Sequence, residues 1–446
     1  MTVLAHSSPP GDSQLDERGC GIAGWPATRL LAGPQRSLGP EPLELHSRRV
    51  GQFVPPASSE QAVELVGASG LLGRGGGEFP FAEKLRAAGA AHGPPLVVVN
   101  GSEGEPASRK DRELLELRPH LVLDGASWAS AAIGAPQVVI YLEAGRCAAW
   151  QAMRSALRER RIERTSDPDF HFVAAPDRYV AGESSAVVSV LEGRGPLPRR
   201  RPIPVAASGV GGRPTVVANT ETLAHLALIA RFGPDWFRQA GSPRAPGSTL
   251  VTLAGEVVNP GLVVEVVEPI ATHRILTSLA GLDGVPEAVL VGGYGGRWVD
   301  GPAIWDAPLD RAVFRAAGCG LGCGLLAVLP RRRCGLAVTH RILDYLAGES
   351  AGQCGSCLFG LPALVEGLGA LIAGRSGRRG PDRLHAAAFE LEGRGGCGHP
   401  DGAAGLLQSA LEVFGADAHR HARRHPCGRD RDGGWFPVPS ERRRRP

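Results

Sequence analysis

Two short apolar runs, Leu96–Val99 and Val138–Leu142, flank a stretch with helical spacing over Asp124–Ile133. A strand, a helix and a strand in this order favour parallel pairing, because a parallel connection needs a crossover of a dozen or more residues. A further apolar run at Phe170–Ala174 extends the pattern. The sequence therefore predicts an α/β layer on a parallel sheet, with ligands bound at the carboxyl ends of its strands.

The texture of the chain changes along its length. We predict an extended N-terminal segment over residues 1–50 and an α/β domain over residues 51–240. Short strands around one helix predict a β-grasp module over residues 246–300, followed by a connecting segment over residues 301–330. Helical spacing predicts a helical domain over residues 331–425, and the basic end, residues 426–446, is expected to be a disordered tail.

Bulk composition limits the class of protein. The 446 residues are 43% hydrophobic and 21% charged, and no run of apolar residues is long enough to span a membrane. The first residues lack the basic and apolar regions of a signal peptide, so we expect a cytoplasmic protein with reduced thiols. No aromatic-interleaved basic stripe is present, so no nucleic-acid partner is expected. The stretch His419–His425 could bind metal adventitiously, but it is interpreted as a solvated helix end.

Two lysines, Lys84 and Lys110, stand among 49 basic residues, and both lie beside loops that could hold phosphate. Lys84 follows Gly73-Arg74-Gly75-Gly76-Gly77-Glu78-Phe79-Pro80, where consecutive glycines can turn backbone N–H groups toward an anion. This loop is not the dinucleotide fingerprint, because a helix and not a strand precedes it. The similar run Gly318–Gly324 fails the same test and is interpreted as a packed turn.

Lys110 closes the acidic loop Asn100–Pro106, which leaves the predicted strand at Leu96–Val99. This loop lies where α/β folds bind ligands. Its carboxylates could form a solvated turn, hold a ribityl or ribose hydroxyl, or meet a cationic ring.

The cysteine pattern points to a metal site. Cys354 and Cys357 have C-x-x-C spacing, and Cys397 follows in a glycine-rich turn. Such spacing places two thiolates on one metal or on adjacent corners of an iron–sulfur cluster. Zinc would need a fourth ligand, for which His399 is a candidate, and purely structural thiols are the other alternative.

Five motifs, in order, resemble the flavin-binding NADH dehydrogenase subunit of respiratory complex I and its relatives in NAD-linked hydrogenases and formate dehydrogenases. Gly73–Pro80 resembles the family's G-R-G-G-A-G-F-P, and Asn100–Arg112 its N-x-D-E-x-E-P-G-x-x-K-D-R. Tyr179–Ala186 resembles Y-x-C-G-E-E-T-A, and Leu191–Gly193 resembles L-E-G. Pro214–Thr222 resembles P-T-x-V-N-N-V-E-T.

The resemblance implies a Rossmann-like FMN-binding domain, a ubiquitin-like (SLBB-type) β-grasp module and a C-terminal helical bundle with a [4Fe–4S] cluster. NADH would lie over the flavin, against Phe79 and beside Glu105, and electrons would leave singly through the cluster. No catalytic residue is assigned. The implied cluster ligands are Cys354, Cys357 and Cys397. The implied FMN-binding residues are Gly73, Arg74, Gly75, Gly76, Lys84, Asn100, Glu103, Tyr179, Gly182, Glu183 and Asn219.

The sequence departs from the family at several of these positions. Ala351 stands where the family has a cluster cysteine, so three thiolates could carry a [3Fe–4S] cluster. Alternatively, water, Ser350, an outside ligand, Cys323 or Cys334 could complete a [4Fe–4S] cluster, or the cluster could be lost. Glu78 replaces a glycine, and its carboxylate would either clash with a bound phosphate or face solvent.

The resemblance implies a subunit that takes hydride from NADH onto FMN and passes electrons to a ferredoxin-like or other acceptor subunit. Such a complex can be membrane-bound, which would place the chain at the inner face of the cell membrane through its partners. Two alternatives stay open. One is a non-catalytic relative that no longer binds NADH and acts as a structural or electron-relay subunit, and the other is a zinc-stabilised binding module that uses the β-grasp region.

Overall fold

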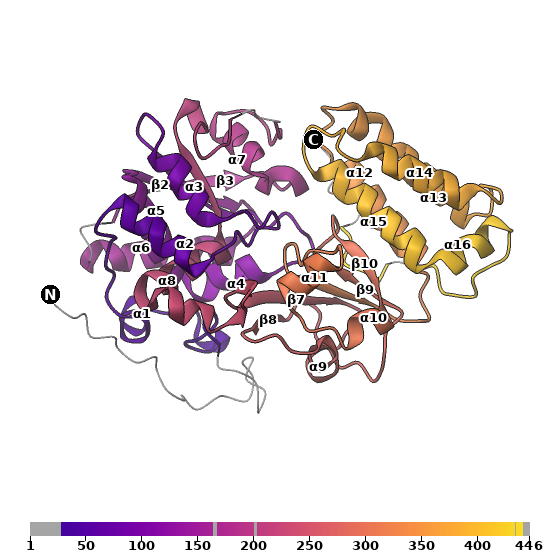
Figure 1. Ribbon diagram of the computed structural model, residues 1–446, viewed down its shortest axis with the longest axis horizontal. Coiled ribbons are helices and arrows are strands. Elements are labelled where there is room, and N and C mark those ends of the chain that lie inside the picture. The colour runs from indigo at the N-terminus through magenta and orange to yellow at the C-terminus, as the bar shows by residue number, and fades with distance from the viewer. Residues whose placement is uncertain (1–27, 164–166, 200–202, 433, 440–446) are drawn as a thin grey trace.

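The computed structural model describes residues 28–163, 167–199, 203–432 and 434–439. Three parts follow one another along the chain (Figure 1): an α/β part drawn in indigo to magenta, a small sheet in orange and a helical part in yellow. No helix among these residues has the length and apolar character needed to cross a membrane.

The first part is built on a four-stranded parallel sheet with the order β3-β2-β1-β4. The alternating strand residues face two different apolar cores. One core packs against α2, α3, α5, α6 and α8, and the other packs against α7. The strands are β1 (Leu96–Gly101), β2 (Gln137–Glu143), β3 (Asp169–Ala175) and β4 (Thr215–Asn219). The helices are α2 (Ser59–Ser69), α3 (Phe81–Gly89), α4 (Lys110–Leu117), α5 (Pro119–Ile133), α6 (Cys147–Glu163), α7 (Ser184–Leu191) and α8 (Thr220–Arg238), with 3-10 turns η2 (Tyr179–Gly182) and η3 (Val210–Gly212).

The predicted parallel α/β layer is therefore confirmed. Its two central helices cross closely because of one glycine. A Cβ on Gly125 of α5 would lie 1.9 Å from the carbonyl oxygen of Leu223 on α8. Any larger residue at position 125 would push these two helices apart. This would also displace the start of α8, which lies beside the predicted site.

The second part is a five-stranded sheet with the order β10-β9-β11-β7-β8. Strands β7 and β11 are parallel, and the other neighbours are antiparallel, which is the β-grasp arrangement. The strands are β7 (Thr249–Gly255), β8 (Val263–Val266), β9 (Ala288–Val291), β10 (Arg297–Asp300) and β11 (Leu325–Leu329), with helices α9 (Thr272–Ser278), α10 (Gly301–Trp305) and α11 (Arg311–Ala316). A short hairpin, β5 (Gly241–Ser242) and β6 (Ala245–Pro246), precedes this sheet.

The third part packs on one face of the second sheet. Leu325, Ala327 and Leu329 of β11 join the core of the helices, while Leu326 and Val328 face α9 and α11 on the other side. This period-two alternation buries both faces of the strand. The helices are α12 (Gly335–Gly348), a π-turn η4 (Ser356–Gly360), α13 (Leu361–Ile372), α14 (Gly380–Leu391), α15 (His399–Val413) and α16 (Gly415–Ala422).

Three of the predicted segments need correction. The segment 1–50 is not extended throughout, because η1 (Arg36–Leu38) and α1 (Leu43–Val50) form within it, and α1 buries Leu43, His46 and Val50. The predicted connecting segment 301–330 contains β11, the central strand of the second sheet, whose pairing partners lie far away in the sequence.

The described part of the predicted disordered tail, residues 426–432 and 434–439, is also packed. Cys427 and Phe436 are buried in the core of the helical part. Aromatic burial at Phe436 and Trp435 outweighs the basic composition on which the prediction rested. The arginines at 442–445 lie outside the described residues, as do residues 1–27.

Candidate functional site

The glycine-rich loop 73–78 joins α2 to α3 and lies against the start of α8. The Arg74 N–H donates to Thr222 Oγ1 at 2.8 Å, and the Gly73 N–H donates to the Phe79 carbonyl at 2.9 Å. Gly76 has a φ of +100°, a conformation that favours glycine. A Cβ on Gly77 would meet nothing within 4 Å. The loop is thus anchored at its ends and open at its tip.

A cavity of about 530 Å³ lies between this tip and two glycine-rich turns of the second part. The turn at Gly318–Gly324 is packed as predicted, since a Cβ on Gly322 would lie 2.4 Å from the Gly292 carbonyl oxygen. It also lines the cavity, which its sequence did not reveal. Walls nearly free of side chains let a flat ring approach the backbone closely. The lining residues are Leu72, Gly76, Gly77, Glu78, Gly292, Gly295, Gly296, Arg297, Arg315, Gly318, Gly320 and Gly322.

Glu78 joins the two sides of this cavity. Its Oε1 lies 2.9 Å from Arg311 Nη1, and its other oxygen pairs with Arg315, so the loop is fastened to α11. Burial opposes ionisation, but the two arginines lower the pKa of Glu78 below its usual value. The sequence suggested that the Glu78 carboxylate would either clash with a bound phosphate or face solvent. It does neither. It pairs instead with Arg311 and Arg315, which lie more than 200 residues later in the sequence and could not be recognised as its partners there.

Two further loop residues differ in their exposure. Phe79 is 52% exposed, so its ring is available for stacking. The Arg74 side chain is buried and turns away to the Pro246 carbonyl, 2.9 Å from Nη2. Burial and the neighbouring Arg311 lower the pKa of Arg74 to about 9. Arg74 can thus offer backbone atoms to a ligand, while its guanidinium fastens the loop to β6.

Strands β1 and β4 end side by side, and this brings four predicted residues together. Asn100 pairs in register with Asn219, and Asn100 Nδ2 donates to the Gly182 carbonyl at 2.8 Å. A Cβ on Gly75 would lie 3.3 Å from the Asn219 Cβ, so the glycine loop passes directly over the end of β4. The predicted site residues from four separate motifs therefore meet at one sheet edge.

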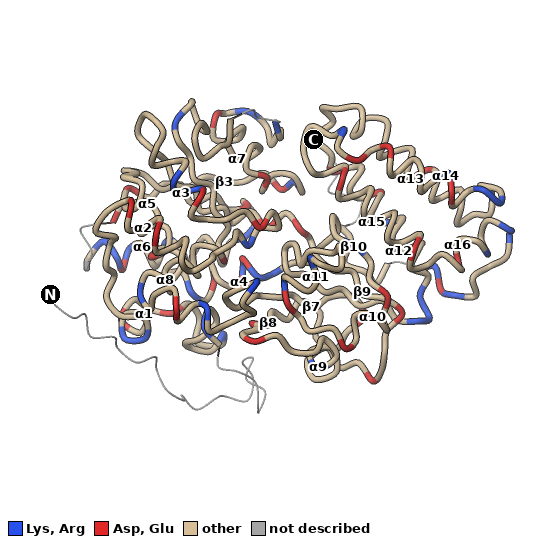
Figure 2. The backbone as a smooth tube through the Cα atoms, in the orientation of Figure 1, with Lys and Arg blue, Asp and Glu red and all other residues tan. Residues whose placement is uncertain are grey.

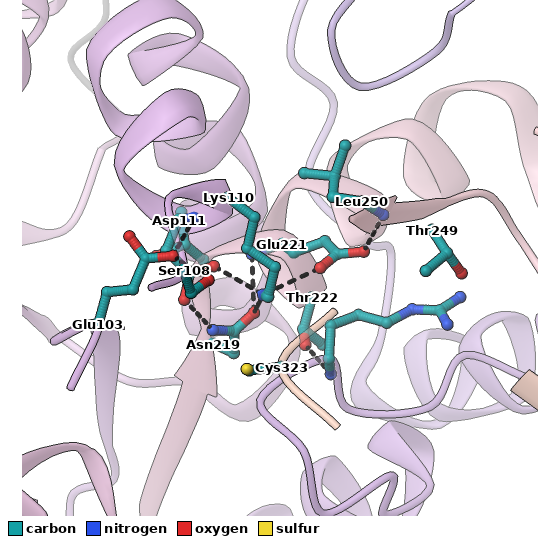
Figure 3. Close-up of polar contacts among 12 residues, drawn as sticks. Glu103, Ser108, Lys110, Asp111, Asn219, Glu221, Thr222, Thr249, Leu250 and Cys323 are labelled. Atoms are coloured by element: carbon teal, nitrogen blue, oxygen red, sulfur yellow. Dashed lines mark hydrogen bonds and ion pairs between the residues drawn. The ribbon is translucent and has the colours of Figure 1, made fainter. Parts of the chain in front are cut away.

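Lys110 is buried at the same edge, in a network of charges (Figure 3). Its Nζ lies 2.9 Å from Asp111 Oδ1, 2.9 Å from Glu221 Oε2 and 3.3 Å from Asn219 Oδ1. Burial lowers the pKa of Lys110, but the two carboxylates outweigh it and raise the pKa above its usual value. Figure 2 shows both signs of charge side by side at α4. Lys110 is thus a structural cation, and its position beside a loop is not a sign of phosphate binding.

Lys84 is in a different situation. Its Nζ donates to the Val217 carbonyl of β4 at 3.0 Å, and burial lowers its pKa with no carboxylate acting on it. A half-buried ammonium without a carboxylate partner is costly, and a bound anion would offset that cost. Of the two lysines, Lys84 is the one fitted to a phosphate.

Two predicted acidic residues act as helix caps. Glu103 accepts from Ser108 Oγ at 2.7 Å and from the backbone N–H groups of Asp111 and Arg112 at the start of α4. Glu183 accepts from the N–H groups of Ser185 and Ala186 at the start of α7. Both carboxylates therefore position backbone at the sheet edge, since each satisfies the free N–H groups of a helix terminus.

Glu105 lies between the first and second parts, buried beside two tyrosines. Its Oε2 accepts from the Tyr294 N–H at 2.7 Å and lies 3.4 Å from Tyr179 Oη, while Oε1 has no partner among the described residues. Tyr179 also accepts from the Gly295 N–H at 3.2 Å. Burial raises the pKa of Glu105 to about 8. Tyr179 thus connects the parts, and the free oxygen of Glu105 could accept a hydroxyl of a bound nucleotide.

This raised pKa makes stability depend on pH. The folded protein holds the Glu105 proton between about pH 4.5 and 8, where the unfolded chain has lost it, so stability falls as pH rises through that window. We expect Glu105→Gln to raise the free energy of unfolding by roughly 2–4 kcal/mol at pH 9 and to have little effect at pH 4.5. Urea unfolding of the flavin-free chain at both pH values measures this, and an equal effect at the two would contradict it.

The predicted cluster cysteines lie together where the helical part meets α7. Cys354 and Cys397 both act on the Cys357 thiol, and Cys354 and Glu183 act on Cys397. Burial alone would raise the pKa of the Cys354 thiol. Hydrogen bonds from the backbone N–H groups of Gly396 and Cys357 outweigh this effect, and the pKa lies below its usual value. The three sulfurs do not all lie within 4.8 Å of one another. That spacing suits a cluster, in which each thiolate binds a different iron, better than a single zinc ion.

The structure narrows the choice of a fourth ligand. Cys323 lies 3.3 Å from the Gly292 carbonyl beside Glu105, and Cys334 lies next to Cys427, so neither joins the three cysteines. His399 Nε2 contacts the Leu346 carbonyl at 2.8 Å, and Nδ1 has no partner among the described residues. Of the candidate side chains considered among the described residues, Ser350 and His399 therefore remain.

These observations fit the two groups that the sequence implies. The open tip at Gly77, the uncompensated ammonium of Lys84 and the unpartnered Glu105 Oε1 suit a flavin phosphate and a nucleotide. The backbone N–H groups around Cys354 suit a thiolate that ligates iron.

Comparison with known proteins gives the same assignment. Residues 66–228 match the Nuo51 FMN-binding domain, and residues 337–421 match the NADH-ubiquinone oxidoreductase-F iron–sulfur binding region. An NADH-quinone oxidoreductase subunit of Rhizobium meliloti, the second of its F type, is 32% identical over 85% of this chain and 92% of the relative. The NADP-reducing hydrogenase subunit HndC of Solidesulfovibrio fructosivorans is 28% identical over 82% of this chain and 77% of that relative.

Solved structures agree with the sequence relatives. The crystal structure of an NAD+-reducing [NiFe]-hydrogenase in the air-oxidized state matches with a TM-score of 0.74 and 29% identity, over 81% of this chain. The present chain spans 63% of that hydrogenase chain. With both domain types present in order and a relative covered over nearly its whole length, the chain belongs to the family of F-type subunits of NADH-quinone oxidoreductase.

Proposed function

We propose that this chain is the flavoprotein subunit of an electron-transfer complex that oxidises NADH. The observation that carries the proposal is the glycine-lined cavity of about 530 Å³ beside the sheet edge where Lys84, Asn100 and Asn219 end. Bound there, FMN would take hydride from NADH and release electrons singly toward an iron–sulfur cluster.

The chain's own residues hold and orient the two nucleotides. Lys84 neutralises the flavin phosphate, while the backbone of Gly75 and Gly76 follows the ligand at close range. Phe79 offers an exposed ring for stacking against the nicotinamide. Glu105 forms a hydrogen bond with a nucleotide hydroxyl through its unpartnered oxygen.

Residues of the helical part provide the exit for electrons. Cys354, Cys357 and Cys397 hold the cluster, and Ser350 or His399 completes it in place of Ala351. Glu183 caps α7 and acts electrostatically on Cys397. One carboxylate therefore links the predicted flavin-binding residues to the cluster cysteines.

The acceptor is a ferredoxin-like or other partner subunit, because the relatives are named as subunits of an NADH-quinone oxidoreductase and of a hydrogenase. Association with such partners would place the chain at the cytoplasmic face of a membrane complex.

A second candidate is a relative that keeps the fold as a structural or electron-relay subunit. The Glu78 ion pairs with Arg311 and Arg315, which span the cavity, favour this alternative, as does alanine at position 351. The two candidates differ in whether NADH binds and reduces a flavin here.

Replacing Lys84 tests the flavin site on which the first candidate depends. A charge-assisted hydrogen bond contributes about 1.5–3 kcal/mol, so Lys84→Met should raise the FMN dissociation constant roughly 10- to 100-fold. Flavin fluorescence quenching on titration of the flavin-free chain measures this constant. Arg86→Met, which changes an exposed residue of the same helix, is the matched control and should leave it unchanged. Equal dissociation constants for Lys84→Met and Arg86→Met would contradict the proposed flavin site.

A further inference from the structure

A buried group of metal-ligand side chains lies in the helical part, apart from the predicted cluster cysteines. Cys334 precedes α12, His421 lies in the last turn of α16, and Cys427 lies in the segment that follows α16. All three are at least 94% buried. The basic neighbours of His421 suggested a solvated helix end, but the His421 side chain is buried. Packing carries its ring inward while His419 and Arg420 stay exposed.

The three ligand atoms converge closely. Cys334 Sγ lies 3.9 Å from His421 Nε2, and the two sulfurs and this nitrogen are all within 4.8 Å of one another. Around a tetrahedral zinc ion, with Zn–S of about 2.3 Å and Zn–N near 2.05 Å, a sulfur and a nitrogen ligand are separated by about 3.6 Å. Small side-chain adjustments therefore bring these atoms to coordination distance. Among the residues described, no other group of three His, Cys, Asp or Glu ligand atoms converges in this way.

A candidate fourth ligand lies on the same helix, outside the group of three whose ligand atoms converge within 4.8 Å. Asp417 lies four residues before His421, so both side chains share one face of α16. The Asp417 carboxylate acts electrostatically on the Cys334 thiol and on the His421 ring, and its Oδ2 lies 2.9 Å from Arg429 Nε. Two thiolates, an imidazole and a carboxylate form a donor set typical of zinc. Arg429 can orient the carboxylate through its ion pair with Asp417.

The surroundings of His421 bear on which ring nitrogen binds. Nδ1 lies 3.3 Å from Arg431 Nη2, and the ring also interacts with the Ile372 carbonyl. Coordination through Nε2 places the proton on Nδ1, where the Ile372 carbonyl can accept it. The Arg431 guanidinium, which can only donate, must then turn aside.

We propose that Cys334, His421 and Cys427, with Asp417 as the fourth ligand, bind a structural zinc ion. This site is separate from the cluster. Cys334 and Cys354 lie beyond opposite ends of α12, whose 14 residues span about 21 Å. The ion fastens the last described segment to the rest of the helical part, where the backbone already pairs at Arg333 and Asp430 and the Cys334 N–H donates to the Asp430 carbonyl at 2.8 Å.

Metal analysis of the full chain tests the proposal. Protein purified anaerobically without chelator is expected to contain zinc in equimolar amount by plasma mass spectrometry. Cys334→Ser and His421→Gln should lose it, while Cys319→Ser, a buried cysteine outside both groups, and Cys357→Ala, in the cluster motif, should keep it. Because a ligand variant can fail to fold, a second measurement uses the unaltered chain. Its zinc, exchanged for Co²⁺, should give visible ligand-field bands and a thiolate-to-cobalt charge-transfer band.

Three results would overturn the proposal. The first is only trace zinc in the unaltered chain together with no cobalt spectrum. The second is zinc that persists in Cys334→Ser or disappears in Cys357→Ala, because the ion would then lie elsewhere. The third is a Cys334–Cys427 disulfide found by peptide mapping of the anaerobic protein. None of these outcomes depends on flavin binding, so the zinc site and the proposed function fail separately.

Discussion

Lys110→Met is expected to lower the free energy of unfolding by about 3–5 kcal/mol, the cost of removing one partner from a buried ion pair. The substitution leaves Asp111 and Glu221 buried without their shared cation, because Lys110 Nζ lies 2.9 Å from each. Asn219 also loses its contact with Lys110, and this contact holds the end of β4 beneath the glycine loop. Chemical denaturation measures the loss, which should shrink below about pH 5 as the carboxylates take up protons.

Two controls separate this explanation from loss of packing. Lys84→Met removes the other lysine, which has no carboxylate partner, and should change the free energy of unfolding by less than about 1 kcal/mol. Adding Asp111→Asn and Glu221→Gln to Lys110→Met removes the uncompensated charges and should restore most of the stability. If the triple variant is no more stable than Lys110→Met, the network is not what Lys110 stabilises.

Cys357→Ala is expected to reduce the iron and acid-labile sulfide of the protein to trace amounts. Its thiol is buried among the cluster cysteines, and only three of the family's four cysteine ligands are present, so the loss of one leaves two. Electron transfer to a one-electron protein acceptor should then fall to background. Reduction of bound FMN by NADH should persist, because the cavity residues lie on other elements.

Cys319→Ser is the matched control for this substitution, since Cys319 is buried but packs in the core of the second part. It should keep its iron and its transfer rate. Full iron content in Cys357→Ala would show that the cluster, if present, is ligated by other residues. Loss of flavin reduction along with iron would instead mean that the substitution disturbs the whole chain.

Local patterns were sufficient to predict the strands of the parallel sheet and the placement of the site at their ends. The apolar runs at Leu96–Val99 and Val138–Leu142 are buried and flanked by turn residues, so their period and length identify them as strands. The consecutive glycines at 75–77 likewise predict an open loop, and the structure shows one.

Features that depend on distant partners could not be predicted. Strand β11 pairs with β7, more than 70 residues earlier, and nothing local marks it as the centre of a sheet. Glu78 meets Arg311 across 233 residues, and Cys334 meets His421 across 87. Lys110 looked like a phosphate ligand because its carboxylate partner Glu221 lies on another helix. Only the folded chain reveals whether a cation is already neutralised.

The most direct test of the proposed function is anaerobic titration of the FMN-loaded chain with NADH while the visible absorbance of the flavin is followed. We expect equimolar NADH to bleach the flavin, and Lys84→Met to show the same bleaching only at much higher FMN concentration. Flavin that stays oxidised in the presence of millimolar NADH, in protein shown to hold FMN, would contradict the account.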